Sequence, residues 1–156
     1  QSLVMDFPIL TNASLPVIGQ ATTAGLIRPA RELGLVRGHL ERLRLRFRSY
    51  LQPVKTLSGG NQQRTLIALL PEDLKLLLLE DPTRGLDVES VRWVWSQLLD
   101  RRKHGTAILF TSPDLDEIIE YSDRVLVFYG GKVTLVEDPS NISVSQLGSL
   151  IGGKTA

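Results

Sequence analysis

Two short segments of the sequence carry residues whose types and spacing could do chemistry, and the first is Leu57-Ser58-Gly59-Gly60-Asn61. Serine is a preferred cap for a helix, and two successive glycines allow a backbone to approach a ligand closely. A helix that begins here presents unpaired N–H groups and the positive end of its dipole, which together suit an anion such as a phosphate group. A plain capped helix explains Ser58, Gly59 and Gly60 equally well, so this segment alone leaves both interpretations open.

The second segment is an apolar run over residues 76–79, which is followed at once by Glu80 and Asp81. A strand that ends in two carboxylates places acid groups at the carboxyl edge of a sheet, where ligands bind in open α/β folds. One carboxylate can hold Mg²⁺ directly or through water, while its neighbour can orient an attacking water molecule. The alternative is a strand end with two solvated acids.

The elements that position these segments follow from the apolar periodicity and from the places of Pro and Gly. Helices are predicted around residues 10–18, from Pro29 onward, and over 33–50, 60–70, 88–103 and 114–121. Strands are predicted over 76–79 and 106–111, with a hairpin over 125–129 and 133–136 around Gly130-Gly131. The continuous apolar run at 76–79 is typical of a strand covered on both faces. Strand–helix alternation from residue 75 onward indicates an α/β layer with parallel strands, preceded by a mainly helical subdomain.

Two of the predicted helices have a clear apolar stripe. In the 33–50 segment the stripe is Leu40, Leu43 and Phe47, with arginines on the remaining faces. In the 88–103 segment the inner stripe is Val91, Trp95, Leu98 and Leu99. Gly105 stands where a glycine commonly closes the C-terminus of a helix.

The composition narrows the function classes. The 156 residues suffice for one domain with a real core, and 42% hydrophobic with 22% charged residues is typical of a globular protein. A net charge of +1 gives no electrostatic footprint for nucleic acid, so the basic stripe Arg42, Arg44, Arg46 and Arg48 is better explained as a solvated helix face. The absence of Cys excludes disulfides and thiolate metal sites. The chain begins at Gln1 rather than Met, which fits a piece of a longer chain, and no apolar run reaches the ~20 residues of a membrane span.

Together the two chemical segments resemble the ABC ATPase family. There Leu-Ser-Gly-Gly-Gln is the signature motif, and an apolar strand ending in Asp-Glu is the Walker B motif. Asn61-Gln62-Gln63 and the Pro-Thr-Arg-Gly-Leu-Asp-Val segment at 82–88 look like ATPase subunits of simple-sugar importers. The resemblance covers essentially the whole chain, and the tail at 141–153 resembles the end of the second, C-terminal cassette of such subunits.

The resemblance implies a fold and a set of site residues. The fold would be α/β: an entry segment and ABC-type helical subdomain with the signature over residues 1–72, then a partial P-loop NTPase (RecA-like) core with parallel strands over 73–156. Ser58, Gly59 and Gly60 would contact the γ-phosphate of an ATP held mainly by an opposing cassette, with Gln62 also in the nucleotide-binding set. Asp87 would be the D-loop aspartate at the interface between cassettes. Glu80 and Asp81 would be the catalytic Walker B pair, with Glu80 as the Mg²⁺ ligand.

The resemblance also implies an activity, partners and a location. The activity would be ATP binding and hydrolysis with Mg²⁺, coupled to import of a sugar-like solute, with this chain supplying the signature, Walker B and D-loop. The partners would be a second ATP-binding cassette and transmembrane permease subunits, without nucleic acid. The location would be cytoplasmic, peripheral on the inner face of the cell membrane.

Two other functions remain open. The first is a degenerate, non-catalytic cassette or fragment that supplies the signature in trans. The second is a soluble ABC-type protein of translation or DNA maintenance, against which Asn61-Gln62-Gln63, Thr83-Arg84-Gly85 and the neutral charge argue.

Three departures from the family pattern bear on hydrolysis. The acids are reversed, because Glu80-Asp81 stands where the family has Asp-Glu, so Asp81 is one methylene short of the water-polarising glutamate. Pro113 occupies the switch position, where active cassettes have a histidine that senses the γ-phosphate, and proline has no side-chain donor or acceptor. The segment between Arg64 and the apolar run is about one residue shorter than usual, with Pro71-Glu72-Asp73 in place of Asp-Pro.

The tail contains a P-loop pattern that we interpret as coincidental. Residues 148–155, Gly-Ser-Leu-Ile-Gly-Gly-Lys-Thr, satisfy it letter for letter. The motif works only between a strand and a helix, because its N–H groups and the helix dipole hold the phosphates. Only Ala156 follows here, so we expect no phosphate site. In the family the true loop lies upstream of the signature, before residue 1 of this sequence.

Overall fold

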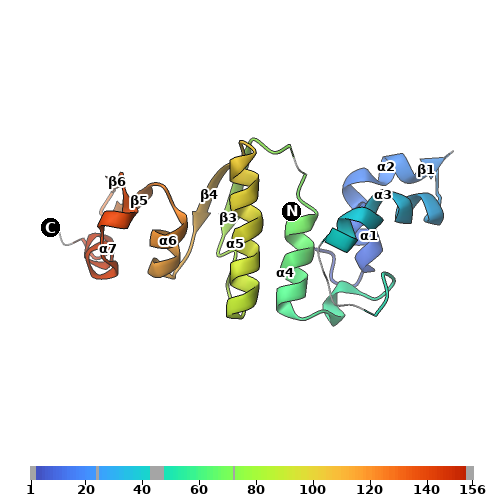
Figure 1. Ribbon diagram of the computed structural model, residues 1–156, viewed down its shortest axis with the longest axis horizontal. Helices are drawn as coiled ribbons and strands as arrows, with labels where there is room; N and C mark the ends of the chain where they lie inside the picture. The colour runs from blue at the N-terminus through green and yellow to red at the C-terminus, as the bar shows by residue number, and fades with distance from the viewer. Residues whose placement is uncertain (1–2, 24, 43–47, 72, 154–156) are drawn as a thin grey trace. The chain divides into compact units, whose positions relative to one another are not determined.

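The structure, a computed structural model, describes residues 3–23, 25–42, 48–71 and 73–153. The chain divides into two compact units, drawn in Figure 1 and each described by itself below. The first unit comprises residues 1–77 and 83–108, and the second comprises residues 78–82 and 109–156. This division differs from the boundary predicted at residue 72, which stays a prediction.

Helices dominate the first unit. They are α1 (Ile9–Ser14), α2 (Ile18–Ala21), α3 (Pro29–Arg42), α4 (Gly59–Ala68) and α5 (Val88–Lys103), with 3-10 turns over Leu15–Val17 and Val54–Thr56. A two-residue antiparallel pair, β1 (Thr22–Thr23) and β2 (Leu26–Ile27), joins α2 to α3. The helix start at Pro29 and the bounds of the 88–103 helix are confirmed.

Two helix predictions in this unit are wrong in extent. The single helix expected around 10–18 is α1, a 3-10 turn and α2, because Pro16 has no N–H to continue the α-helical hydrogen bonds. The helix expected over 33–50 ends at Arg42 as far as the structure describes it, and residues 48–50 are not helical. Leu43, Phe47, Arg44 and Arg46 lie outside the described residues.

A buried cluster holds α1 and α3 together with the segment that precedes α4. Its members are Ile9, Leu10, Ala13, Val36, Leu40, Val54 and Leu57. Leu40 of the predicted stripe is buried here, one helical turn from Val36, which was not predicted.

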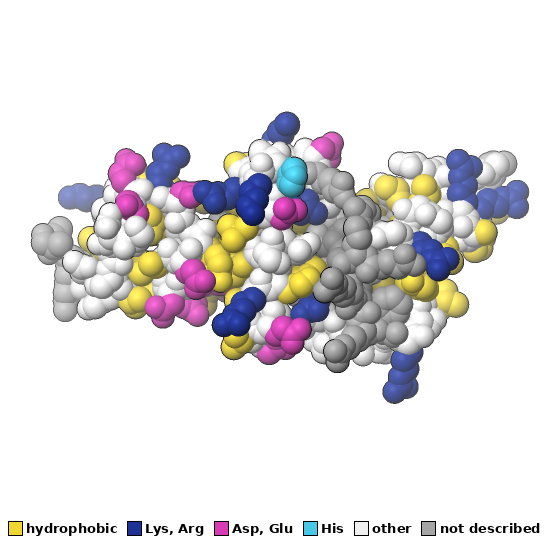
Figure 2. All heavy atoms as spheres, in the orientation of Figure 1, with side chains coloured by type: hydrophobic (Ala, Val, Ile, Leu, Met, Phe, Trp, Pro, Cys, Tyr) yellow, Lys and Arg dark blue, Asp and Glu magenta, His cyan; other side chains and the backbone are white. Residues whose placement is uncertain are grey.

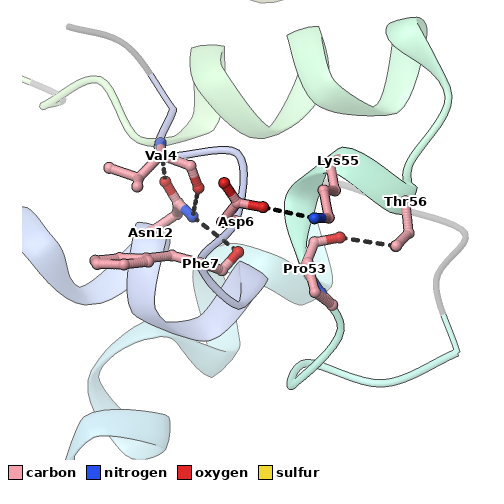
Figure 3. Close-up of polar contacts among 7 residues, drawn as sticks. All are labelled: Val4, Asp6, Phe7, Asn12, Pro53, Lys55 and Thr56. Carbon is pink, nitrogen blue, oxygen red and sulfur yellow. Dashed lines mark hydrogen bonds and ion pairs between the residues drawn. The ribbon is translucent and has the colours of Figure 1, made fainter.

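The entry segment is tied to the same region by Asn12, which is buried in α1 (Figure 3). Its side-chain oxygen accepts from the Val4 amide at 2.8 Å, and its amide nitrogen donates to the carbonyls of Val4, Phe7 and Pro8 at 3.0, 3.3 and 3.1 Å. Nearby, the Lys55 ammonium lies 2.6 Å from Asp6, an exposed pair of small energetic value. Asn12 therefore satisfies backbone groups that the irregular entry would otherwise leave unpaired.

Strands β3 (Leu76–Glu80) and β4 (Ala107–Thr111) pair side by side, and they run in the same direction. At their starts the Ala107 amide donates to the Lys75 carbonyl at 2.9 Å, and just past their ends the Asp81 amide donates to the Thr111 carbonyl at 3.0 Å. Both residue numbers rise between the two bonds, which is the parallel pattern. The predicted parallel pair is confirmed.

The prediction that β3 is covered on both faces is wrong for the described chain. Leu77 is buried, whereas Leu76 and Leu78 on the opposite face are largely exposed. Successive side chains of a strand point to opposite faces, and none of the described residues covers the face that carries Leu76 and Leu78. A run of leucines indicates that both faces of the strand are apolar, but it does not indicate what covers each face.

The second unit contains the hairpin and two helices. Its elements are α6 (Leu115–Tyr121), β5 (Val125–Tyr129), β6 (Lys132–Val136), a 3-10 turn over Pro139–Asn141, and α7 (Val144–Ile151). Gly130 and Gly131 both have positive φ, 54° and 74°, as a two-residue hairpin turn requires, and the predicted hairpin is confirmed. Its inner face buries Val125 and Val127 against Leu147 of α7.

The tail does not form a P-loop among its described residues. The first four residues of the pattern, 148–151, are the last turn of α7 rather than a loop after a strand, and Gly152 closes that helix. Lys154 and Thr155 lie outside the described residues.

The surface of the described chain carries mixed charge. On the face drawn in Figure 2, acidic and basic side chains are interspersed. Within the described ranges no helix is long and apolar enough to cross a bilayer.

Candidate functional site

The start of α4 presents free backbone donors. Ser58 is its N-cap: its carbonyl accepts the first helical bond from Gln62 at 2.9 Å, and its hydroxyl accepts from Asn61 at 3.5 Å. The amides of Gly59 and Gly60 have no acceptor among the described residues, and Gly59 is exposed. Two unpaired amides at the positive end of a helix dipole can bind an oxyanion.

The two glycines face different surroundings. A Cβ built on Gly59 meets nothing within 4 Å, so this glycine faces open space. A Cβ built on Gly60 would lie 2.5 Å from the Ser90 hydroxyl oxygen and 3.3 Å from the Ser90 Cβ, so a side chain at residue 60 fits against α5 only if Ser90 shifts. The sequence could not separate these two roles, because both residues have the same type.

Gln62 is engaged inside its own unit. Its side-chain amide donates to the Leu57 carbonyl at 3.0 Å and to the Val54 carbonyl at 3.5 Å. The side chain thus fastens the loop before the signature to α4. A nucleotide contact by Gln62 remains a prediction.

Asp87 is the N-cap of α5. Its carboxylate accepts from the Ser90 amide at 2.8 Å, and its backbone is extended as a cap requires. The Ser90 amide and then the Ser90 hydroxyl hold the pKa of Asp87 below its ordinary value, with a smaller contribution from the Arg64 guanidinium, while desolvation opposes the shift. Asp87 is therefore a fixed, ionised carboxylate beside the start of α4.

Helices α4 and α5 lie side by side and run in the same direction (Figure 1). At their N-terminal ends Gly60 packs on Ser90, as described above. One turn further, the Arg64 guanidinium lies 5.1 Å from the Trp93 ring centroid and 3.7 Å from a Glu89 carboxylate oxygen. This stacking is a cation–π contact, and it is largely buried because the Arg64 side chain is 14% exposed.

Arg101 closes the other end of the helix pair. Its guanidinium donates to the carbonyls of Pro71 at 2.5 Å, Leu70 at 2.8 Å and Ile67 at 3.4 Å. These carbonyls belong to the C-terminal end of α4 and the residues after it, where helical donors run out. The Ile67 carbonyl also accepts from the Leu70 amide at 3.2 Å. Both ends of α4 are thus fastened to α5, and the N-termini of the two helices share one end.

The two acids lie in the second unit, at the carboxyl ends of β3 and β4. Glu80 is the last residue of β3 and is exposed, and Asp81 follows with its amide bonded to Thr111. This bond brings Asp81 to the segment that contains Pro113.

Asp81 has a left-handed backbone, with φ of 44°. It is the one non-glycine residue with positive φ among those described. Aspartate enters this region more readily than most residues, because its short polar side chain can bond locally, whereas glutamate lacks that advantage. The backbone therefore offers a physical reason for Asp, rather than Glu, at the second acid position.

The acids fit Mg²⁺ by donor type. Magnesium in phosphate-binding sites is usually held by one or two carboxylates together with phosphate oxygens and water. Glu80 and Asp81 supply such oxygens, and within the described ranges no group of three His, Cys, Asp or Glu forms a denser metal site.

Three residues of this region were missed by the sequence analysis. Ser90 occupies the third position of a helix capped by Asp87, so the Asp-x-x-Ser spacing carried a signal for the cap although not for the Gly60 contact. Arg64 follows the signature, yet nothing in the sequence indicates Trp93 as its partner. Arg101 resembles any basic residue in a last helical turn until its acceptors are known.

The comparisons with known proteins place the chain in a family. No family model matches it. It is 37% identical over 134 residues to Ribose import ATP-binding protein RbsA of Roseobacter denitrificans, a match that covers 85% of this chain and 26% of the relative. It is 35% identical over 144 residues to the protein of the same name from Jannaschia sp., covering 92% of this chain and 28% of that relative. The chain belongs to the ABC transporter ATP-binding family.

Solved structures show the ABC cassette fold. The ATP-binding cassette MJ0796, in a dimeric post-hydrolysis state with ADP and Pi, matches with a TM-score of 0.66 at 22% identity, over 86% of this chain and 58% of that chain. MJ1267, an ATP-binding cassette of an ABC transporter, matches with a TM-score of 0.66 at 18% identity, over 97% of this chain and 63% of that chain. The predicted fold class, a partial P-loop NTPase core with an ABC-type helical subdomain, is confirmed.

This ABC-family chain spans about a quarter of the length of the relatives it matches, 26% and 28% for the two named above. Its position in the second cassette and the roles of its individual residues remain predictions.

Proposed function

We propose that this chain is part of the ATP-binding subunit of an ABC importer for a sugar-like solute, and that it presents its signature to ATP held by a second cassette. The observation that carries the proposal is the open start of α4, where the amides of Gly59 and Gly60 have no acceptor among the described residues. The ribose-import names of the relatives support the solute class.

In this proposal the residues of the first unit bind and orient. The Ser58 hydroxyl and the Gly59 and Gly60 amides stabilise negative charge on the γ-phosphate when two cassettes close on ATP. Asp87, the N-cap of α5, lies beside them as an ionised carboxylate and faces the opposing cassette. The helical subdomain passes closure and reopening to transmembrane permease subunits, which places the assembly at the cytoplasmic face of the membrane.

The acids of the second unit would act on the chain's own nucleotide. Glu80 would hold Mg²⁺, which neutralises phosphate charge when bound. Asp81 would orient the attacking water through its shorter side chain. Hydrolysis of ATP would reopen the two cassettes.

A degenerate cassette is the second candidate, and two observations at one sheet edge favour it. Asp81 is held in a left-handed conformation that suits aspartate, and Pro113 leaves the switch position without a donor or acceptor. In that case the chain contributes its signature in trans, while hydrolysis occurs at the other nucleotide site.

The test is ATP turnover by the natural subunit that contains this sequence, assembled with its permease. Ser58→Ala should lower turnover at least tenfold, equivalent to ~1.4 kcal/mol of barrier. Ser143→Ala is the matched control, because Ser143 is likewise a serine N-cap, on α7 of the second unit. Each change removes one helix cap worth ~1 kcal/mol of stability, so equal turnover losses in the two variants would refute a nucleotide role for the signature.

A further inference from the structure

We propose that Ser90 is a positioning residue, which locks the signature helix to the Asp87 cap by packing against Gly60. Its importance for ATP turnover rests on the function proposed above, whereas the lock itself is a property of this chain. The two glycines of the signature then differ in kind: Gly59 faces the ligand side, and Gly60 faces the neighbouring helix.

The first observation is steric. Ser90 is buried, and its hydroxyl oxygen occupies space 2.5 Å from where a Cβ of residue 60 would stand. Real Cβ atoms essentially never approach another heavy atom that closely, so a side chain at residue 60 must displace the Ser90 hydroxyl. Rotation of the hydroxyl does not remove the crowding, because the Ser90 Cβ itself would remain 3.3 Å away.

The second observation is that Ser90 serves the cap at the same time. Its amide donates to the Asp87 carboxylate at 2.8 Å, and its hydroxyl also bonds that carboxylate. One residue therefore contacts Gly60 on α4 and Asp87 at the start of α5. Moving α4 toward α5 at this point disturbs the hydroxyl that orients Asp87.

The third observation is that the rest of the helix pair resists relaxation. Arg64 is stacked on Trp93 and paired with Glu89 one turn further along, and Arg101 bonds three carbonyls at the far end of α4. A side chain at residue 60 thus cannot be accommodated by simply sliding α4 away from α5. The displacement falls on Ser90 and, through it, on Asp87.

The experiment follows the Asp87 carboxyl by NMR during a pH titration of the 156-residue chain, with no nucleotide present. Gly60→Ala should raise the pKa of Asp87 toward its ordinary value, because the added methyl displaces the Ser90 hydroxyl. Gly59→Ala is the matched control and should leave that pKa in place, since its methyl enters open space. Arg64 and Glu89, the other charged groups near Asp87, are unchanged in both variants.

A double-mutant cycle separates the lock from two independent effects. Ser90→Ala should raise the Asp87 pKa by itself, because the hydroxyl is lost. Gly60→Ala combined with Ser90→Ala should then give no further rise, since the methyl acts through the hydroxyl. Additive shifts, or an Asp87 pKa that is unchanged by Gly60→Ala, would overturn the proposal.

The proposal can also be tested if the Gly60→Ala variant does not fold. In that case Gly60→Ala combined with Ser90→Gly should recover the folded chain, because both crowding atoms are removed. A double variant that stays unfolded overturns the proposal. None of these measurements uses ATP, so their failure leaves the proposed function standing, and an inactive subunit leaves the lock standing.

Discussion

The α4–α5 pair and the carboxyl ends of β3 and β4 differ in how far each matches the family pattern and in how closely its surroundings hold it. At the first, the signature glycines and Asp87 match the family pattern, and each is held by contacts within its own unit. At the second, the acids are reversed, the switch position holds Pro113, and one face of β3 lies open among the described residues. The signature segment keeps the family pattern and is held by its neighbours, whereas the acid segment departs from the family pattern at the positions that the proposed function assigns to water and phosphate.

This contrast indicates which of the two regions needs a fixed geometry and which can tolerate changed residues. In the proposed function the signature acts on ATP held by another cassette, so it requires a rigid helix start. The contacts of Ser90, Arg64 and Arg101 between α4 and α5 supply that rigidity. The proposed function assigns the Glu80-Asp81 pair to the chain's own nucleotide, where the side-chain lengths of the two acids matter. Relaxed chemistry with retained presentation is the pattern expected of a cassette that mainly serves its partner.

The largest effect should come from the buried side of the helix pair. Leu98 on α5 is fully buried and Leu78 on β3 is 65% exposed, so Leu→Ala is the same chemical change in opposite surroundings. Leu98→Ala should lower the free energy of unfolding by about 2–5 kcal/mol, through lost burial and a cavity. Leu78→Ala should change it by no more than about 0.5 kcal/mol, as surface substitutions usually do.

Urea denaturation of the two variants checks this difference. Equal losses would show that the open face of β3 is covered in solution, and the contrast between the two regions would then fail at its packing level.

A smaller effect should come from Arg101, which fastens the far end of α4. Arg101→Ala should cost about 2 kcal/mol of unfolding free energy, because three carbonyls lose a charged donor. Arg92→Ala, on the exposed side of the same helix, is the control and should stay within about 0.5 kcal/mol. Thermal or urea unfolding measures both, and indistinguishable variants would mean that α4 is not fastened at this end.

The acid order should matter less than the motif suggests. In the natural subunit, Glu80→Asp combined with Asp81→Glu should change ATP turnover by less than tenfold, or ~1.4 kcal/mol. The reasons are that Pro113 still leaves the switch position without a sensor and that the left-handed backbone at residue 81 does not favour glutamate.

The control exchanges the same residue types elsewhere, with Asp116→Glu and Glu120→Asp on α6. A rise of tenfold or more in the Glu80/Asp81 double variant alone would show that acid order limits hydrolysis, and the acid side would then be a repairable enzyme site.

The smallest effect concerns pH and Asp87. Its pKa is depressed in the folded chain by the Ser90 hydrogen bonds, so its ionised form stabilises the fold above the ordinary aspartate value of 3.8. That contribution should be lost as the pH falls through the lower, folded pKa. Asp87→Asn, which retains a capping oxygen, should lack this dependence.

Urea midpoints of the two proteins between neutral pH and pH 3 test the sign. The advantage of the wild type over Asp87→Asn should be constant at higher pH and shrink toward the acid end. An advantage that grows on acidification would contradict the capped, ionised state of Asp87.

The sequence predicted most of the local structure and little of what links it. The 88–103 helix, the hairpin at Gly130-Gly131 and the start at Pro29 were predicted correctly, because caps, turn glycines and periodicity are local signals. Gly105 follows α5 with φ of 94°, as its predicted closing role requires. The buried stripe of α5 was nearly right, although Val94 is fully buried and was not predicted.

The features that the sequence did not predict depend on tertiary contacts. Nothing at residue 60 tells which of two adjacent glycines faces a helix, since that depends on Ser90, thirty positions away in the chain. The left-handed backbone at Asp81 likewise depends on how the chain leaves β3 beside Thr111. The family pattern named the residues of both candidate sites, while their internal contacts required the structure.

The backbone pairing at the base of the helical subdomain has a consequence for how this part of the chain can vary. Pro8 and Pro53 bridge, and Val54 and Lys55 donate their amides to Phe7 and Met5 at 3.0 and 2.9 Å. The two ends of the intervening stretch therefore lie side by side, joined by these backbone bonds. Ile9, Val36 and Leu40 of this stretch share a buried cluster with Val54 and Leu57 outside it, so the cluster limits what can change. Only the exposed connections of the stretch can change length at small cost, since doubling the length of a closed loop costs only ~0.6 kcal/mol in closure entropy. These connections can therefore vary while the buried cluster and α4 beyond it stay unaltered.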